Sequence, residues 1–270
     1  MEYKTLLWAF LSFCIEVTSD RDGKFAFIRQ PQAMAVNIAV LGQTMEKLIA
    51  HVCGDDKAKT EEYCDRLKKI AESEFEEFFM ISYLEMQRAK LGLTGDGEGE
   101  SSNLQLYKEL EMLMHRSRCD FTILFRLLSA AASAETPEDA LQILAPGFYD
   151  FDAIFKSKPA GVDSGLDQKN PDSEVWYKWL TKYLERVKAE GQDRCAREAT
   201  QLSANPKFVL RNWMSIMAYE DAEKGDYSVL RELEQILQNP YDEQSEEISL
   251  RWFRRTPEWA EGMPGSSFLS

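Results

Sequence analysis

Residues 205–243, NPKFVLRNWMSIMAYEDAEKGDYSVLRELEQILQNPYDE, decide the fold because they carry the pattern of two packed helices. Pro206 fits a first helical turn, where its missing N–H costs nothing. Gly225 is expected to end the first helix, and Asp226 or Ser228 to cap the second. Two apolar faces recur at helical spacing: Leu210, Trp213, Met214 and Met217, then Val229, Leu233, Ile236 and Leu237, with Pro240 as the stop. The stretch therefore predicts a helical hairpin.

The same periodicity upstream predicts a mainly α fold with roughly eight or nine helices. Gly92 suits a left-handed helix C-cap, and Thr136 followed by Pro137 marks a helix start. Phe25 to Ile28 is expected to form a short extended piece. Helical patterns cover residues 32–52, 57–71, 75–91, 104–115, 121–132 and 175–187, and loops are expected at 94–103 and 156–173. The sequence shows no series of strands, no fixed repeat and no heptad run.

Composition limits the classes of partner. The chain has 270 residues with 32 basic and 46 acidic side chains, which gives a net charge of −14. This balance argues against a nucleic-acid binder or an anionic-membrane binder, because both need basic patches. The densest basic spot is Arg251, Arg254 and Arg255 around Trp252 and Phe253, and we interpret it as a solvated turn.

The cysteines and the first residues bear on the compartment. The five cysteines are scattered and form no CxxC pair, so they predict reduced, mostly buried thiols rather than disulfides or a zinc site. The apolar run at residues 5–15, TLLWAFLSFCI, is too short to span a bilayer. We interpret it as a buried segment, with a signal peptide as the alternative.

Acidic residues suggest one candidate calcium site, but two positions of the calcium-loop pattern are not met. Asp96, Glu98 and Glu100 occupy alternate positions as in a calcium loop. Ser101 stands where that loop needs glycine, and Tyr107 stands where it needs a bidentate glutamate. We therefore interpret this stretch as a solvated loop.

The remaining candidates also favour structural roles. His51, Cys53 and Cys64 lack a fourth ligand at zinc-like spacing, and His115 fits a surface position. An acidic cluster on the wet side of a helix is formed by Glu72, Glu74, Glu76 and Glu77. The chain also lacks GxxxxGK[ST], strand-linked GxGxxG, HRD, DFG and GxSxG motifs. We therefore assign no catalytic, cofactor-binding or metal-binding residue.

Five islands of sequence, in order, resemble the selenoprotein O (SelO, or YdiU) family of pseudokinase protein adenylyltransferases. The first is SDRDGKFAFIRQP with Asn37 and Ile38, where Val36 replaces the family's usual tryptophan. The others are YLEMQRAKLGL at 83–93, DFTILFRLLS at 120–129, VWYKWLTKYLERV at 175–187, and NPKFVLRNW through NPYDE. The resemblance divides the chain into a divergent N-terminal segment (1–17), a SelO-like helical C-lobe region (18–250) and a C-terminal tail (251–270).

The resemblance implies a kinase-like fold that uses ATP and Mg or Mn to transfer AMP to protein Ser, Thr or Tyr hydroxyls. The family's nucleotide and metal residues lie upstream of the first island, where this chain reads MEYKTLLWAFLSF instead of a DYGPFGF-type motif. No catalytic residue can therefore be carried over. The chain ends in GMPGSSFLS, without the terminal selenocysteine or cysteine of many eukaryotic members. The family also implies a mitochondrial or cytoplasmic location and protein partners. From the charge balance and the short apolar run we expect no nucleic-acid partner and no stable membrane span.

Three hypotheses follow from these observations. The first is the C-terminal helical portion of a SelO-type adenylyltransferase, inactive by itself. The second is a stand-alone, non-catalytic helical module that binds a protein partner. The third is a helical hydrolase with a carboxylate-bound metal.

Overall fold

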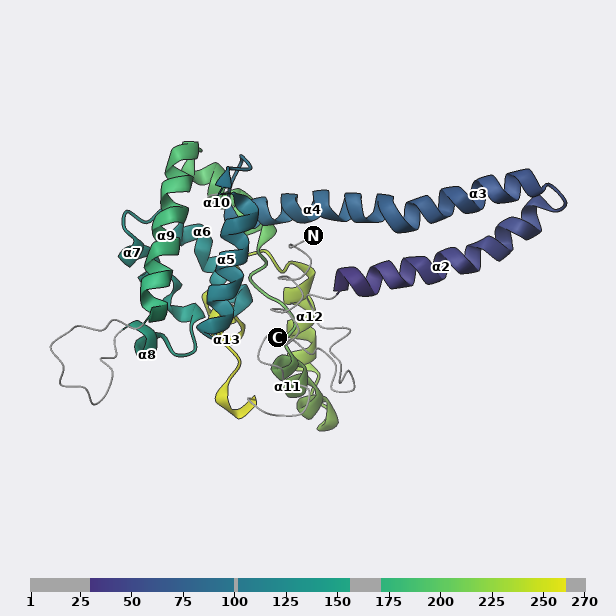
Figure 1. The fold of residues 1–270 in the computed structure, drawn as a ribbon. Coiled ribbons are helices and arrows are strands. Elements are labelled where there is room, and N and C mark those ends of the chain that lie inside the picture. The colour runs from purple at the N-terminus through teal and green to yellow at the C-terminus, as the bar shows by residue number, and fades with distance from the viewer. Residues whose placement is uncertain (1–29, 100–101, 156–170, 261–270) are drawn as a thin grey trace. The chain divides into compact units, whose positions relative to one another are not determined.

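The computed structural model describes residues 30–99, 102–155 and 171–260, and it confirms the mainly α class (Figure 1). These residues form twelve α-helices, α2 to α13, rather than eight or nine. Beyond helices, their backbone pairing includes an isolated bridge between Cys119 and Phe148. The helices are α2 (Gln30–Cys53), α3 (Lys57–Lys69), α4 (Phe75–Leu91), α5 (Asn103–Arg116), α6 (Phe121–Ala131), α7 (Pro137–Leu144), α8 (Phe151–Phe155), α9 (Pro171–Glu190), α10 (Arg194–Ala204), α11 (Asn212–Glu223), α12 (Ser228–Gln238) and α13 (Glu246–Trp252).

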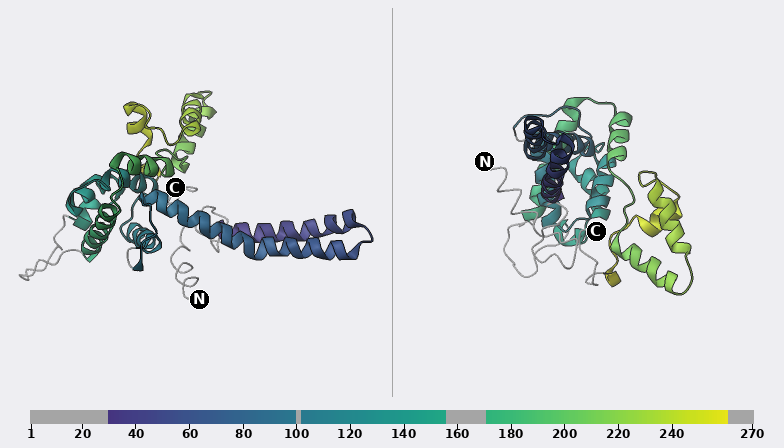
Figure 2. Two further views of the ribbon diagram at one scale, coloured as in Figure 1. Left: turned by 90° about the horizontal axis from the view of Figure 1, so that it is seen from above. Right: turned by 90° about the vertical axis from the view of Figure 1, so that its right-hand side faces the viewer.

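The chain divides into two compact units, and the boundary between Tyr83 and Leu84 falls inside α4. The sequence gives no sign of this division, because it depends on which helices pack together. Within the first unit, α2 and α3 run antiparallel and side by side (Figures 1 and 2). Gly54 turns the chain between them with φ +57°, and the Asp56 side chain caps α3 by accepting a hydrogen bond from Lys59 N.

A five-residue π-helical segment, η2 (Ile70–Glu74), joins α3 to α4 without a break. The carboxylate of Glu74 lies 3.8 Å from both Arg66 and Lys69. Past this segment, Phe75, Phe79 and Tyr83 stack along α4 at a spacing of four residues. The joint therefore ends α3 and begins a helix with a different side-chain face.

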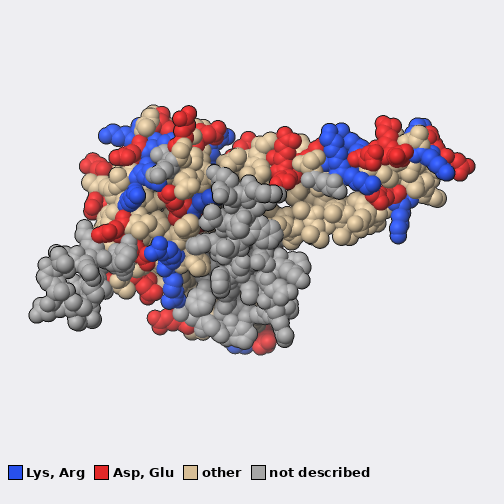
Figure 3. Space-filling view, in the orientation of Figure 1, with Lys and Arg blue, Asp and Glu red and all other residues tan. Residues whose placement is uncertain are grey.

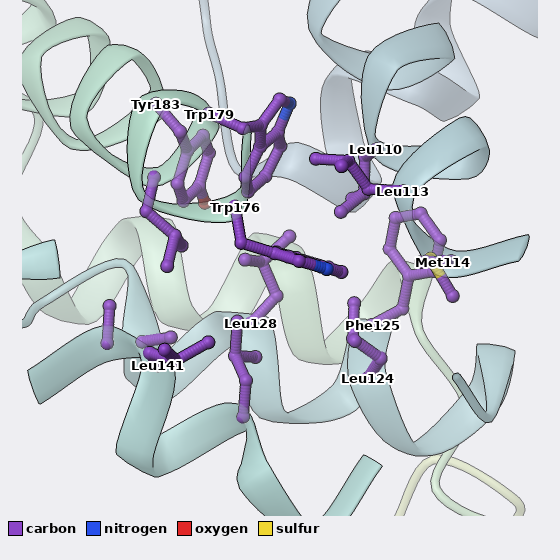
Figure 4. Packing of buried hydrophobic residues seen from close by; sticks show 14 of the residues in the cluster. Leu110, Leu113, Met114, Leu124, Phe125, Leu128, Leu141, Trp176, Trp179 and Tyr183 are labelled. Carbon is purple, nitrogen blue, oxygen red and sulfur yellow. The ribbon is translucent and has the colours of Figure 1, made fainter. Parts of the chain in front are cut away.

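The second unit is built on a hydrophobic core contributed mainly by α5, α6, α7 and α9. In Figure 4, Trp176 lies between the pair Trp179 and Tyr183 and the side chains of Leu124 and Leu128. Trp176 and Leu128 are fully buried. Their indole and aliphatic surfaces account for the apolar stripe that the sequence shows on residues 175–187.

A second cluster in the same unit is formed by α11, α12 and α13. Trp213 stacks on Trp252 with ring centroids 5.6 Å apart, and Val229, Leu233 and Ile236 pack beneath them. The predicted hairpin is thus confirmed from Asn212 to Gln238. Gly225 ends its first helix with φ +84°, and Asp226 Oδ1 accepts from Ser228 N at 2.8 Å.

Pro206 does not begin a helix, contrary to the sequence prediction. Residues 205–211 are non-helical, because the N–H groups of Lys207 and Phe208 both donate to the carbonyl oxygen of Pro240. Leu210 consequently lies outside α11 and is exposed. A long-range backbone pairing that local propensity cannot show thus replaces one helical turn.

The interpretation of the basic spot at 251–255 as a solvated turn holds for Arg251 and Arg254, which are exposed, but not for Trp252. Trp252 is buried, and Arg254 lies over the ring of Trp213. Helix α9 begins at Pro171, inside the predicted loop. The predicted extended piece at 25–28, most of the loop at 156–173 and the run at 5–15 lie outside the described residues.

Candidate functional site

The most densely connected polar site lies in the second unit, where Arg126 joins α6 to two distant segments. Its guanidinium donates to the carbonyl oxygens of Leu202 and Asn205 at 2.9 and 2.8 Å. It also donates to Tyr241 O at 2.9 Å and to Glu243 Oε1 at 2.5 Å. The side chain is only 5% exposed. A buried arginine with four acceptors works as a structural clamp.

Lys207 completes the clamp from the other side of Glu243. Its ammonium donates to Glu243 Oε2 at 2.6 Å, to Glu243 O at 2.8 Å and to Ser249 Oγ at 2.9 Å. It also lies over the rings of Phe208 and Phe253. Burial alone would raise the pKa of Glu243, but hydrogen bonds from Lys207 and Arg126 lower it. Glu243 is therefore held as a carboxylate between two cations.

Lys90 at the end of α4 reaches the same segment. Its ammonium donates to Asn205 Oδ1 at 3.0 Å and to Ala204 O at 3.2 Å, and it lies over the rings of Phe121 and Phe125. Desolvation by burial lowers the pKa of Lys90 from 10.5 to about 8. This lysine is thus partly neutral near physiological pH.

Gly92 explains how α4 comes so close to α10. Its φ of +68° confirms the predicted left-handed C-cap, and a Cβ there would lie 2.5 Å from Gln201. Gln201 is buried and donates to the hydroxyl oxygen of Tyr183 at 3.2 Å. Tyr183 in turn donates to Leu91 O at 2.8 Å, and burial raises its pKa.

A second buried ion pair connects the two hydrophobic clusters. Arg211 donates to both carboxylate oxygens of Asp120, with 2.8 Å from Nη2 to Oδ1. The side chains are 3% and 4% exposed. Asp120 also caps α6 by accepting from Ile123 N at 2.9 Å. The same carboxylate thus starts a helix and holds the segment that leads into α11.

A shallow surface pocket of about 380 Å³ lies at the start of α8. The side chain of Arg255 borders it and donates to Phe148 O, and Arg118 pairs with Asp150 at 3.3 Å. Arg118 and Arg255 both lie over the ring of Tyr149. The charges around this pocket are engaged with one another, so the pocket gives no basis for assigning a ligand.

The candidate ligands considered from sequence do not come together. Asp96 and Glu98 are exposed, with Asp96 3.6 Å from Arg88, and His51 is exposed at the end of α2. Glu100 lies outside the described residues. Among residues 30–99, 102–155 and 171–260, no three His, Cys, Asp or Glu side chains gather to hold a metal ion. The described residues therefore do not fit the divalent metal that the resemblance implies, and we assign no step through ATP or metal to them.

The polar clamp went unrecognised in the sequence, although its members lie within the quoted islands. Arg126 is the single charge in the apolar helix FTILFRLLSAA. A lone arginine on such a helix indicates a buried and paired group, and this signal was available. The acceptors, which are backbone carbonyls of Leu202, Asn205 and Tyr241, carry no sequence signal of their own. The site therefore builds a framework, and its geometry contains no nucleophile and base pair.

Comparison with known proteins gives a consistent result. A model of the SelO family, described as protein adenylyltransferase SelO, matches residues 9–238. A protein nucleotidyltransferase YdiU of Flavobacterium johnsoniae is 32% identical over 253 residues, which cover 94% of this chain and 42% of the relative. Those of Burkholderia multivorans and Ectopseudomonas mendocina are 30% and 29% identical, covering 90% and 89% of this chain and 41% and 40% of the relatives. The chain thus spans about two fifths of the length of these relatives. None of the helices in the described ranges has the length and apolar character needed to cross a bilayer.

Proposed function

The chain belongs to the SelO family of protein adenylyltransferases, and on this premise we propose that it is the helical framework portion of a SelO-type enzyme. The enzyme transfers AMP from ATP to Ser, Thr or Tyr hydroxyls of protein substrates. This portion supplies the helical support, and the nucleotide and metal ligands come from the part of the family sequence that it does not match. The proposal includes protein substrates and a mitochondrial or cytoplasmic location, both taken from the family.

One observation carries the proposal. The family-like islands at 83–93, 120–129, 175–187 and 205–243 supply Lys90, Arg126, Tyr183 and Glu243, which all belong to the polar network described above. The islands are separated along the chain, but their side chains contribute to one polar network, which indicates a common structural role. That role is to hold the second unit together, since every cation in the network is engaged by acceptors within the chain.

The test compares the chain alone with a chimera. In the chimera, the 253 matched residues of the Flavobacterium johnsoniae protein are replaced by the aligned residues of this chain. We expect calorimetry with ATP and Mg²⁺ or Mn²⁺ to detect no binding to the 270-residue chain. We expect the chimera to label a protein substrate with AMP from radioactive ATP. ATP binding by the chain alone, or a soluble chimera without transfer, would contradict the proposal.

The second candidate is a non-catalytic module that binds a protein partner. The exposed apolar side chains of α2 favour it, because such a surface needs a partner. A chain that is soluble and stably folded alone, whose chimera does not transfer AMP, would support this candidate over the first.

A further inference from the structure

Helix α2 carries an apolar stripe that the described residues of the first unit leave largely exposed. Its six residues alternate at spacings of four and three, which is the pattern of a helix–helix seam. Val52 is 75% exposed and Leu41 is 60% exposed. The stripe consists of Met34, Ile38, Leu41, Met45, Leu48 and Val52. It is shorter than a sustained heptad run, and its first five residues belong to the helical pattern that the sequence predicts for residues 32–52.

The stripe is distinct from the face that α2 turns to α3. Gly42 is buried, and a Cβ there would lie 3.8 Å from Leu67 of α3. Ala35 and Ile49, seven residues to either side of Gly42, are half-buried on the same face. The intramolecular contact therefore uses one side of α2 and leaves the stripe exposed except at Ile38, which is half-buried at its border.

The stripe carries no charge. The 24 residues of α2 contain Glu46 and Lys47 as their charged side chains, and neither belongs to the stripe. Figure 3 shows the visible side of α2 as almost entirely tan, whereas α3 carries many red and blue side chains. A helix that is apolar on more than one side is a helix meant to be enclosed. An uncharged seam also fits an apolar helix face better than a charged partner.

Relatives show what such a partner can be. The family match covers the whole sequence of α2 and α3. In the Flavobacterium johnsoniae protein the matched region is 42% of the length, which leaves 100 − 42 = 58% outside it. We propose that the α2 stripe is the docking face for this remaining part of the SelO fold, which would present a complementary apolar helix. The proposal rests on the proposed function above, since it names the partner of that framework.

The test measures how fast a thiol on the stripe reacts. Leu41→Cys is made in the 270-residue chain and in the chimera, and alkylation is followed peptide by peptide by mass spectrometry. Gln43→Cys is the matched control, because Gln43 is also exposed but lies on another side of α2. We expect the thiol at position 41 to react at least about tenfold more slowly in the chimera than in the chain alone. The thiol at position 43 should react at similar rates in both.

A second substitution tests whether the stripe itself does the docking. Leu48→Glu, added to Leu41→Cys, should restore fast alkylation in the chimera because it places a charge in the seam. Gln43→Glu adds the same charge off the stripe and should leave the slow rate unchanged. Neither substitution should alter the rate in the chain alone.

Three outcomes would overturn the proposal. They are equal rates at position 41 in chain and chimera, an insoluble chimera, and a chain that is already protected because it forms a dimer through the stripe. Failure of the proposed function gives a different result: a protected thiol at position 41 in a chimera that does not transfer AMP. The alkylation rate thus reports docking, and AMP transfer reports catalysis, independently of each other.

Discussion

The two units of this chain are both helical, yet they differ in what their helices bury. Between residues 31 and 83, Gly42 alone is buried among the side chains whose exposure the structure describes. In the second unit, large side chains such as Trp176, Trp213 and Leu128 are almost completely buried. Helical periodicity is present in both. The comparison teaches that an apolar stripe predicts a helix in either unit, but it does not tell whether the chain itself supplies the other side of the contact.

Polar groups follow the same division. In the second unit, Arg126 and Lys207 donate hydrogen bonds to Glu243 and to several carbonyl oxygens, and Arg211 donates to Asp120. In the first unit, the ion pairs are exposed or loose, as between Arg66 and Glu74 at 3.8 Å. Buried pairs are costly to break, whereas exposed pairs contribute little. Among the described residues, the ion pairs that are costly to break therefore lie in the second unit.

The largest effect is expected from Arg126→Met. The variant leaves Leu202 O, Asn205 O and Tyr241 O without their donor, so we expect a loss of about 3–5 kcal/mol in the free energy of unfolding. Arg194→Met, at an exposed position on α10, is the control and should change it by less than about 0.5 kcal/mol. Urea titration followed by circular dichroism measures both. A loss below about 1 kcal/mol for Arg126→Met would show that the contacts of Arg126 do not stabilise the second unit.

The same substitution in each unit tests the comparison directly. Leu128→Ala creates a cavity in the core and should cost about 2–5 kcal/mol in the free energy of unfolding. Leu48→Ala removes a side chain that is 51% exposed and should cost less than about 1 kcal/mol. Chemical denaturation of the two variants side by side gives the difference. Equal losses would show that the stripe on α2 is already packed in the isolated chain.

Gly54 and Gly92 both have left-handed backbone, but only Gly92 is tightly packed. Comparing their alanine variants therefore separates the cost of the backbone conformation from the cost of the steric clash. Alanine at either Gly54 or Gly92 meets the left-handed penalty of roughly 1–2 kcal/mol. At Gly92 the added Cβ also displaces Gln201, which is hydrogen-bonded to Tyr183, whereas Gly54 has nothing within 4 Å. We therefore expect a clearly lower melting temperature for Gly92→Ala than for Gly54→Ala. Equal melting temperatures would mean that α10 yields freely to the new methyl group.

The last effect concerns pH and Lys90. Its pKa falls to about 8 in the folded protein, so between about 8 and 10.5 the unfolded chain holds a proton that the folded chain has released. The stability that depends on Lys90 therefore rises with pH across this window. Relative to Lys90→Met, the wild-type free energy of unfolding should improve from pH 8 to pH 10.5. A constant difference across that range would argue against a depressed pKa.

Local signals in the sequence were sufficient for most helices and several caps. Thr136 accepts a hydrogen bond from Asp139 N with Pro137 in the first turn, as predicted, and Gly92 takes the left-handed conformation. These features are set by residues close along the chain, where propensity and capping act.

Features that depend on distant partners were missed or mistaken. The sequence places Pro206 in a helix because the carbonyl of Pro240, which accepts from the N–H groups of Lys207 and Phe208, is distant along the chain and carries no sequence signal. Trp252 was assigned to a solvated turn because its stacking on Trp213 is a tertiary contact. The network around Arg126 uses mainly backbone acceptors, which every residue possesses. Such contacts are fixed by the fold as a whole and not by any one segment.

The π-helical segment at Ile70–Glu74 has a consequence for how the first unit tolerates insertions and deletions. A π turn accommodates one residue more than an α turn, so the residues after it are offset by roughly 100° around the helix axis. Deleting one of the five residues would let an ordinary helix run through and would keep the ladder of Phe75, Phe79 and Tyr83 on its present side, because the deletion removes the one residue that the π turn absorbs. Loss of one residue within this segment should therefore be tolerated better than loss of one residue elsewhere in α3 or α4, which would rotate the ladder by roughly 100° around the helix axis.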